Sequence, residues 1–282
     1  MRTPTHRQRL KSSLIRQSVV VLACVLACLL VYLLVRLIAG PAWLAPAPIP
    51  AATQAAVPTA SEVPLGLVPK GERLSIGKRT PNPGFPLDNL KREIAPHGKP
   101  HCPHVPMVRY KGDIIRYHSA LYIYVHFRAR LKLFEQVVKQ TALDVYGRAP
   151  RQIRHIGTYN CRRIAAYPTL LSEHGVGNGI DVTGFDFGRA PRAKKGPAGA
   201  GELGAVASTL PRELKRAFRV RILKHWYAKS GVAYSHHRRF LRLLAARLVQ
   251  RRDIFRVLLG PGDPAHKNHF HFDVARYRLV NL

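Results

Sequence analysis

Apolar residues form one continuous run near the N-terminus and periodic patterns only after about residue 110. Residues 19–35 carry no charged side chain, and the apolar run resumes after Arg36. A helix rises about 1.5 Å per residue, so a run of this length can cross a hydrocarbon core of about 30 Å. We therefore predict a transmembrane helix over residues 18–40. The alternative interpretation is a cleaved signal peptide.

The charges before this run predict its orientation. Residues 1–17 contain five basic side chains and no acidic one. By the positive-inside rule, residues 1–17 stay in the cytoplasm and everything after residue 40 lies outside. Residues 41–70 are rich in Ala and Pro, which favours an extended polyproline II linker. The remaining residues, 71–282, form the predicted folded domain.

Periodic patterns in this domain mix helical and strand spacing. One long or broken helix is predicted over residues 113–145, ended by Gly147 and Pro150, and a second helix over 234–251. Strands are predicted over 153–158, 180–182, 218–227, 254–259 and 270–274. Residues 188–211 are rich in Gly, Ala and Pro and read as a flexible basic insertion. Without a regular alternation of strand and helix, the fold class is α+β, an antiparallel sheet with flanking helices.

The composition shows that the chain is not a wholly disordered basic tail, and it indicates polyanionic partners. With 46% hydrophobic residues the chain can build a core. Lys and Arg number 46 against 15 Asp and Glu, a formal charge of +31, and six of the basic residues lie in the first 40, so residues 41–282 keep +25. Anionic lipid headgroups, cell-wall polymers and nucleic acid are all possible partners of such a charge. No recognised nucleic-acid motif with interleaved aromatic residues accompanies it, so nucleic acid is the least favoured partner.

Two cysteines, Cys102 and Cys161, follow the predicted membrane span. In an oxidising compartment such a pair is a candidate disulfide, although spacing alone does not prove it. The chain has no C-x-x-C motif, which disfavours thiol redox chemistry and a cysteine-rich zinc site.

Metal-binding side chains concentrate in residues 172–182 and 266–273. In the second segment, period-two alternation places His269, His271 and Asp273 on one face of a strand and two phenylalanines on the other. In the first, three glycines between His174 and Asp181 allow a tight turn before a short strand. This arrangement can bring side chains of both segments to one point.

A set of two histidines and one aspartate suits Zn²⁺ and leaves the fourth tetrahedral position open. We predict His174, Asp181 and His271 as ligands, although His269 could also serve as a ligand from the same strand as His271. Glu173 is expected to orient an imidazole by hydrogen bonding, and Asp273 to support His271 or a basic neighbour. The chain lacks H-E-x-x-H, so no zincin-type glutamate base is expected.

These motifs resemble two groups of bacterial proteins. The pattern from Ser172 to Asp181, followed by His269-x-His271, is similar to the LAS zinc peptidases: D-alanyl-D-alanine carboxypeptidases, D-Ala-D-Ala dipeptidases and penicillin-insensitive murein endopeptidases. Over residues 100–277 the closer resemblance is to the extensin-like C-terminal domain family, through Tyr-Asn-Cys-Arg at 159–162, Ser-Glu-His at 172–174, Ile-Asp-Val at 180–182 and the segment 259–271.

The resemblance implies a function for each site residue. His174, Asp181 and His271 would bind Zn²⁺, His269 would be the acid/base histidine, and His266 matches a further histidine of the endopeptidases. Arg162 would bind a substrate carboxylate or carbonyl. Two residues separate Tyr159 from Arg162, so Arg163 remains an alternative.

The expected protein is therefore a zinc metallopeptidase with a LAS-like fold. It would be anchored by one span in the inner membrane, with its C-terminal domain in the periplasm, and would cleave peptide bonds in peptidoglycan stem peptides or cross-links. Ser172 is expected at the substrate site. The alternatives are a zinc-stabilised cell-wall-binding module without catalysis and a binder of nucleic acid or anionic lipid.

Overall fold

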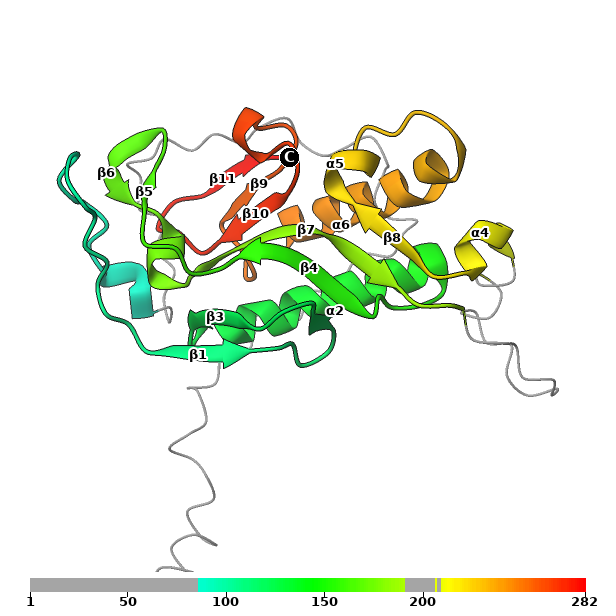
Figure 1. Cartoon of the computed structure of the whole chain (residues 1–282), viewed down its shortest axis with the longest axis horizontal. Helices are drawn as coiled ribbons and strands as arrows, with labels where there is room; N and C mark the ends of the chain where they lie inside the picture. The colour runs from blue at the N-terminus through cyan, green and yellow to red at the C-terminus, as the bar shows by residue number, and fades with distance from the viewer. Residues whose placement is uncertain (1–85, 191–205, 207–208) are drawn as a thin grey trace, which may run out of the picture. The chain divides into compact units, whose positions relative to one another are not determined.

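The computed structural model describes residues 86–190, 206 and 209–282 (Figure 1). The chain divides into two compact units, residues 1–51 and 52–282, and all described residues belong to the second. The predicted membrane span, the linker and most of the 188–211 insertion lie outside the described residues. Among the described helices, none has the length and apolarity that a membrane crossing requires.

The described segments alternate short strands with a few helices. The helices are α2 (Phe127–Tyr146), α4 (Arg212–Lys215), α5 (Ile222–His225) and α6 (Arg239–Gln250), with shorter turns η1 (Pro86–Asn89), η2 (Glu173–Val176), η3 (Ala233–Arg238) and η4 (Pro264–His266). The strands are β1 (Met107–Tyr110), β2 (Arg116–Tyr117), β3 (Leu121–Tyr124), β4 (Gln152–Gly157), β5 (Arg163–Ile164), β6 (Tyr167–Leu171), β7 (Gly179–Phe187), β8 (Phe218–Arg221), β9 (Val257–Leu259), β10 (Phe270–Asp273) and β11 (Leu279–Asn281). The fold is mixed α+β, as predicted.

One seven-stranded sheet organises these elements. Its order is β11-β9-β10-β7-β4-β2, with β8 also paired to β7. Four of the pairings are antiparallel, but β11 runs parallel to β9 and β2 runs parallel to β4. The core of the sheet is therefore antiparallel, as predicted, whereas the parallel strands β11 and β2 at its edges were not predicted.

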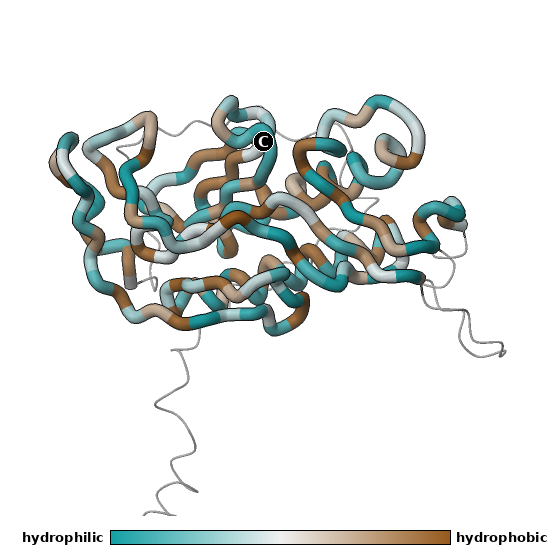
Figure 2. The backbone as a smooth tube through the Cα atoms, in the orientation of Figure 1, coloured by the Kyte–Doolittle hydropathy of each residue, from teal (hydrophilic) through white to brown (hydrophobic). Residues whose placement is uncertain are grey.

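Helices α2 and α6 cover one face of this sheet (Figure 1). The ring of Phe134 on α2 packs edge-on against Phe272 of β10, and Phe240 on α6 packs edge-on against Phe185 of β7. Figure 2 shows apolar positions recurring along both helices and the strands that they cover. All four rings are fully buried, so the opposite face of β7 and β10 is left for polar side chains.

A buried ion pair also joins the two helices. Arg247 of α6 is fully buried, and its Nη1 lies 2.6 Å from Oδ2 of Asp144 on α2. The same nitrogen donates to the Thr141 hydroxyl at 3.1 Å. Removing one partner of such a pair leaves a buried charge uncompensated, so this contact constrains how α6 packs on α2.

The predicted helix over residues 113–145 is correct only in its second half. It ends as predicted, with Gly147 at φ 63 and its N–H bonded to the Leu143 carbonyl. Its first half instead holds β2 and β3. Apolar residues spaced by three or four between 114 and 125 also fit two short strands joined by turns, and pairing with β4 and β1 decides the outcome.

Other elements follow the predictions more closely. The strand predicted over 153–158 is β4, and the strand predicted over 180–182 extends through β7. The helix over 234–251 is present, but its first turn is the π-type η3. The strand over 218–227 stops at Arg221, where α5 begins. The closing strands β9 and β10 pair as expected, and η4 follows the turn between them.

A pair of buried histidines lies where η3 meets α5. The rings of His225 and His237 are 4.6 Å apart between centroids, and Nδ1 of His237 lies 2.9 Å from the Tyr146 hydroxyl. Burial, reinforced by neighbouring positive charge, lowers the pKa of His225 to about 4 and that of His237 to about 3. Both rings are therefore neutral in the fold at neutral pH.

We predict that this pair sets an acid limit on stability. Unfolding releases each histidine to its ordinary pKa near 6.5, so the unfolded state takes up protons first as pH falls. Stability should fall from about pH 6.5 to about pH 4, with His225 alone contributing on the order of 3 kcal/mol. His237→Phe, measured by urea unfolding across this range, should flatten the pH dependence.

The matched control is His104→Phe, because His104 is exposed. It should unfold with the same pH dependence as the parent. An acid limb of equal steepness in the His237→Phe variant would contradict this account.

Candidate metal centre

The site forms where β10 lies beside β7. In this antiparallel pair, His271 is the direct partner of Asp181 in the register. Phe270 and Phe272 point into the core, as alternation predicts, so His271 and Asp273 point to the other face. His174 reaches the same point from η2, which precedes β7. Strand register therefore sets two of the three converging side chains.

Local turn chemistry places the third side chain, His174. Ser172 caps η2, and its hydroxyl accepts the backbone N–H of His174 at 3.3 Å. Gly177 ends the turn at φ 62, and a Cβ there would approach Met107 and the Tyr124 backbone. A side chain at position 177 would therefore be both strained and obstructed. These constraints explain the glycine between the two ligand positions.

Outer hydrogen bonds fix which ring nitrogen of each histidine faces the site. Nδ1 of His174 lies 2.8 Å from the Thr158 carbonyl, which only accepts, so this nitrogen is the donor. Nε2 of His271 lies 2.7 Å from Oδ2 of Asp273 and donates to that carboxylate. In the neutral rings, the inward nitrogens Nε2 of His174 and Nδ1 of His271 therefore carry lone pairs.

Three acceptor atoms thus converge with no donor among them. The inward nitrogens are 3.1 Å apart, and Oδ1 of Asp181 lies 3.2 Å from Nε2 of His174 and 2.8 Å from Nδ1 of His271. Lone pairs at such distances repel unless a cation lies between them. The site needs either a proton or a metal ion to be stable.

The pKa shifts of His271 and Asp181 agree with this need for a cation. Burial would lower the pKa of His271, but hydrogen bonds to Asp181 and Asp273 outweigh burial and raise it to about 10. Burial likewise opposes ionisation of Asp181, but hydrogen bonds to His174 and His271 hold its pKa well below the usual range. Without a metal, a proton on His271 occupies the space between the acceptors. A divalent cation would compete with that proton.

The donor set fits zinc. Two imidazole nitrogens and one carboxylate oxygen are borderline ligands, and zinc–ligand bonds of about 2.0–2.2 Å place tetrahedral ligands about 3.3–3.6 Å apart. The observed separations of 2.8, 3.1 and 3.2 Å are shorter, so the three side chains would move slightly apart to hold the ion. Among the described residues, this group alone gathers three such side chains with ligand atoms within 4.8 Å of one another.

His269 and His266 lie beside this group but not within it. Nε2 of His269 is 3.6 Å from Oδ1 of Asp181, and its Nδ1 lies 2.7 Å from the Asn268 side-chain oxygen. Burial lowers the pKa of His269 to about 4, so the ring is neutral at pH 7. Nδ1 of His266 is held 2.7 Å from Asp263, and the His266 and His269 rings lie 5.0 Å apart.

A cavity of about 690 Å³ opens beside the three acceptors. Its lining includes Asp181, His271, His266, His269, Arg162 and Ser172, so it contains most of the predicted site residues. The hairpin of β5 and β6, and the segment containing η4, also contribute to its wall. The volume suits a short peptide or another ligand of similar size.

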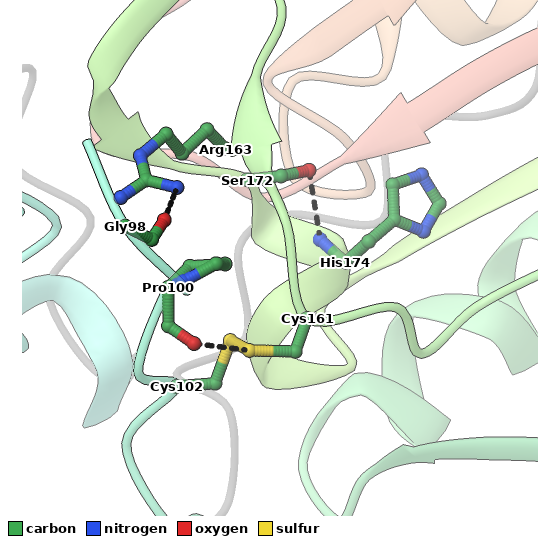
Figure 3. The surroundings of a disulfide bond; sticks show 7 residues. All are labelled: Gly98, Pro100, Cys102, Cys161, Arg163, Ser172 and His174. Atoms are coloured by element: carbon green, nitrogen blue, oxygen red, sulfur yellow. Dashed lines mark hydrogen bonds between the residues drawn. A yellow bond between two sulfur atoms is a disulfide. The ribbon is translucent and has the colours of Figure 1, made fainter. Parts of the chain in front are cut away.

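The side chains of Arg162 and Arg163 have different surroundings. Arg162 lines the cavity, whereas the Arg163 guanidinium donates to the carbonyls of Ala95, His97 and Gly98. Figure 3 shows Arg163 turned toward Gly98 rather than toward the His174 ring. Arg162 is therefore the arginine that a ligand in the cavity can reach.

The predicted disulfide is present directly before Arg162. Cys102 and Cys161 are joined, with their Cα atoms 5.8 Å apart (Figure 3). A Cβ built on Gly175, next to His174, would lie 2.9 Å from the Cys102 sulfur. The disulfide thus packs against the His174 turn and ties the segment before β1 to the cavity wall.

Glu173 does not orient an imidazole, contrary to the prediction. Its carboxylate accepts two bonds from the Arg92 guanidinium, at 2.7 and 3.1 Å, and one from the Asn178 side chain at 2.6 Å. The Asn178 side chain also donates to the Val274 carbonyl. This buried network joins the segment at Arg92 to η2 and to the end of β10. Asp273 does support His271, as predicted.

Sequence reasoning missed several cavity residues. Tyr277, Tyr167 and Asn281 line the cavity, and burial raises the pKa of Tyr277, which keeps its hydroxyl protonated. These residues lie outside the histidine motifs, and only the paths of β6 and β11 bring them to the site. Ser172 lines the cavity, but its hydroxyl is engaged in capping η2.

One protein-family model matches a part of the chain that includes some of the site residues. The family model described as Extensin-like protein C-terminus matches residues 88–195. The match includes the two cysteines of the disulfide, Arg162, His174 and Asp181, and it ends before His271. No curated protein and no solved structure matches the chain.

We predict that Asp273 strengthens metal binding through His271. Asp273→Asn removes the charge that orients and polarises the ring, so zinc affinity should fall about tenfold or more. The measurement is competition for zinc with a chromophoric chelator. The control is Asp263→Asn, which alters a cavity carboxylate bound to His266 and should leave zinc affinity unchanged. Equal losses in both variants would contradict a specific contribution from Asp273.

Proposed function

We propose that this protein is a membrane-anchored, zinc-dependent hydrolase of peptide bonds in peptidoglycan stem peptides or cross-links. One observation carries the proposal: the inward nitrogens of His174 and His271 and one carboxylate oxygen of Asp181 lie 2.8–3.2 Å from one another at the edge of a peptide-sized cavity. The motif resemblance to the LAS peptidases supports the same chemistry. The extensin-like match over residues 88–195 is compatible with it.

Zinc in such a site supplies two effects: it polarises a carbonyl and makes a nearby water more acidic. The protein supplies the proton acceptor. His269 is neutral at pH 7, and its Nδ1 contact with Asn268 leaves the Nε2 lone pair free on the side of Asp181. Nε2 can take a proton from the attacking water and return it to the leaving amine.

The lowered pKa of His269 weakens the ring as a base for removing the proton of the attacking water. A base with a pKa of about 4 drives proton removal less strongly than an exposed histidine would. The same low pKa makes the protonated ring a strong acid toward the leaving amine. His269 therefore fits the second proton transfer better than the first.

Arg162 provides the charge that binds the substrate. The other charged groups named in the cavity wall have partners within the protein: Asp263 pairs with His266, Glu173 with Arg92 and Asp273 with His271. Arg162 faces the cavity, where its guanidinium can bind a carboxylate or carbonyl of a peptide. Peptidoglycan peptides carry such groups.

The proposed location follows from the sequence. A span over residues 18–40 would anchor the chain in the inner membrane, and the folded domain would lie in the periplasm, where the disulfide can form. The linker would let the domain search the nearby cell wall.

A second candidate is a zinc-stabilised module that binds cell-wall peptides without cutting them. The low pKa of His269 favours this alternative, because it weakens the proposed base. Both candidates use the same cavity and metal, and they differ in turnover.

We predict that zinc-loaded fragment 52–282 releases new peptide products from purified muropeptides, detected by mass spectrometry. His269→Ala should lower the rate about a hundredfold or more, since it removes the proton-transfer group, while bound zinc stays stoichiometric. Lys267→Ala changes an exposed side chain of the same loop and should keep parental activity.

The outcomes separate the two candidates. Products that persist in His269→Ala would rule out the proposed proton transfer. Binding of muropeptides without any product, in a folded and zinc-loaded protein, would show that the domain is the binding module.

A further inference from the structure

A second surface, formed by residues that do not line the cavity, lies on α5, η3 and the start of α6. Three of the most exposed large hydrophobic side chains lie there: Leu223 at 66%, Tyr227 at 56% and Tyr234 at 49%. Together with the basic side chains beside them they form what we call the α5–η3 face, which consists of Leu223, Lys224, Tyr227, Tyr234, Arg238 and Arg242. Figure 1 shows its elements in yellow to orange.

Ring and guanidinium contacts make this face continuous. The Arg242 guanidinium lies 6.0 Å from the centre of the Tyr227 ring, and the Arg238 guanidinium lies 5.3 Å from that of Tyr234. Arg238 and Arg242 are four residues apart on adjoining helical turns, so they are neighbours. Leu223 and Lys224 are exposed on α5, and Tyr227 is exposed two residues after it. Exposed apolar and basic side chains therefore lie close together in the chain.

The surrounding chain contains no opposing charge. Residues 214–252 include twelve Lys and Arg and no Asp or Glu. Lys224 and Arg239, which are among these twelve, are exposed. No acidic side chain from this segment can neutralise the face, so it presents a positive potential to solvent.

We propose that the α5–η3 face docks the domain onto an anionic phospholipid surface. Leucine and tyrosine side chains at a membrane interface gain by leaving water, and tyrosine rings are favoured at the headgroup level. Basic side chains near an anionic leaflet add about 1 kcal/mol each. The phosphates of nucleic acid could also pair with the arginines. Unlike a membrane, however, nucleic acid offers no hydrocarbon region in which the Leu223 side chain could be buried.

The face is also tied to the cavity. The Tyr227 hydroxyl donates to the Pro261 carbonyl at 2.8 Å, and Pro261 precedes the cavity residue Asp263 by two positions. Docking through the α5–η3 face would hold this cavity wall close to the membrane surface. This inference stands on the surface residues and does not require the proposed peptidase activity.

The test is co-sedimentation of fragment 52–282 with vesicles. This fragment contains the whole hydrophobic core described here, whose residues lie between 87 and 282. Vesicles of phosphatidylcholine alone are compared with vesicles containing about one third phosphatidylglycerol. We expect binding to the anionic vesicles only, weakening as salt is raised.

Two substitutions separate the apolar and the charged contributions. Leu223→Asn should weaken binding to anionic vesicles about tenfold, and Lys224→Gln about fivefold. The matched controls are Ile156→Asn, equally exposed but on β4, and Lys139→Gln, exposed on α2. Both controls should bind as the parent does. Thermal unfolding checks that every variant is folded.

Three results would overturn the proposal. Equal binding to both vesicle types would remove the need for anionic lipid. Equal effects of Leu223→Asn and Ile156→Asn would show that the α5–η3 face is not the docking surface. The third result has two parts: Lys224→Gln loses vesicle binding while Leu223→Asn keeps it, and duplex DNA binds as tightly as vesicles do. Together they would show that the face binds any polyanion through charge alone.

Discussion

The candidate site depends on one constraint, which is that three acceptor atoms, two of them on buried histidines, point at one another. Thr158 and Asp273 each hold the outer nitrogen of a histidine as a donor, so the inner nitrogens face Asp181 with their lone pairs. A proton on Nδ1 of His271 can satisfy this arrangement in part, because the charged ring then lies between the Asp181 and Asp273 carboxylates. A metal ion satisfies all three acceptors together. The surrounding network of Arg92, Glu173 and Asn178 holds the ligand segments in that arrangement.

Sequence patterns predicted which side chains lie together beside β7 and β10 better than they predicted the surrounding elements. Alternation along residues 269–273 correctly placed His271 and Asp273 on one face, and the glycines before Asp181 correctly indicated a tight turn. The end of α2 at Gly147 also follows the prediction. Each of these features is set by residues close in the chain, where period and turn chemistry decide the result. The disulfide joins cysteines 59 residues apart, and spacing alone had left that pairing open.

The errors have a common cause, which is pairing between distant segments. Residues 113–124 have apolar residues at a spacing that suits a helix, but they form β2 and β3, which pair with β4 and β1. Glu173 is adjacent to a ligand, yet its partner Arg92 lies 81 residues away and no local signal announces it. Tyr277 reaches the cavity only because the chain returns to the sheet in β11. Long-range contacts of this kind override local propensity.

The most direct test of the metal centre is X-ray absorption at the zinc edge of the zinc-loaded domain. The account predicts one zinc per chain with two imidazole ligands, the remaining ligands being light oxygen donors, and loss of one imidazole in His174→Ala. A shell with three imidazoles would place His269 or another histidine among the ligands. Failure to bind zinc stoichiometrically in a folded domain would contradict the metal centre itself.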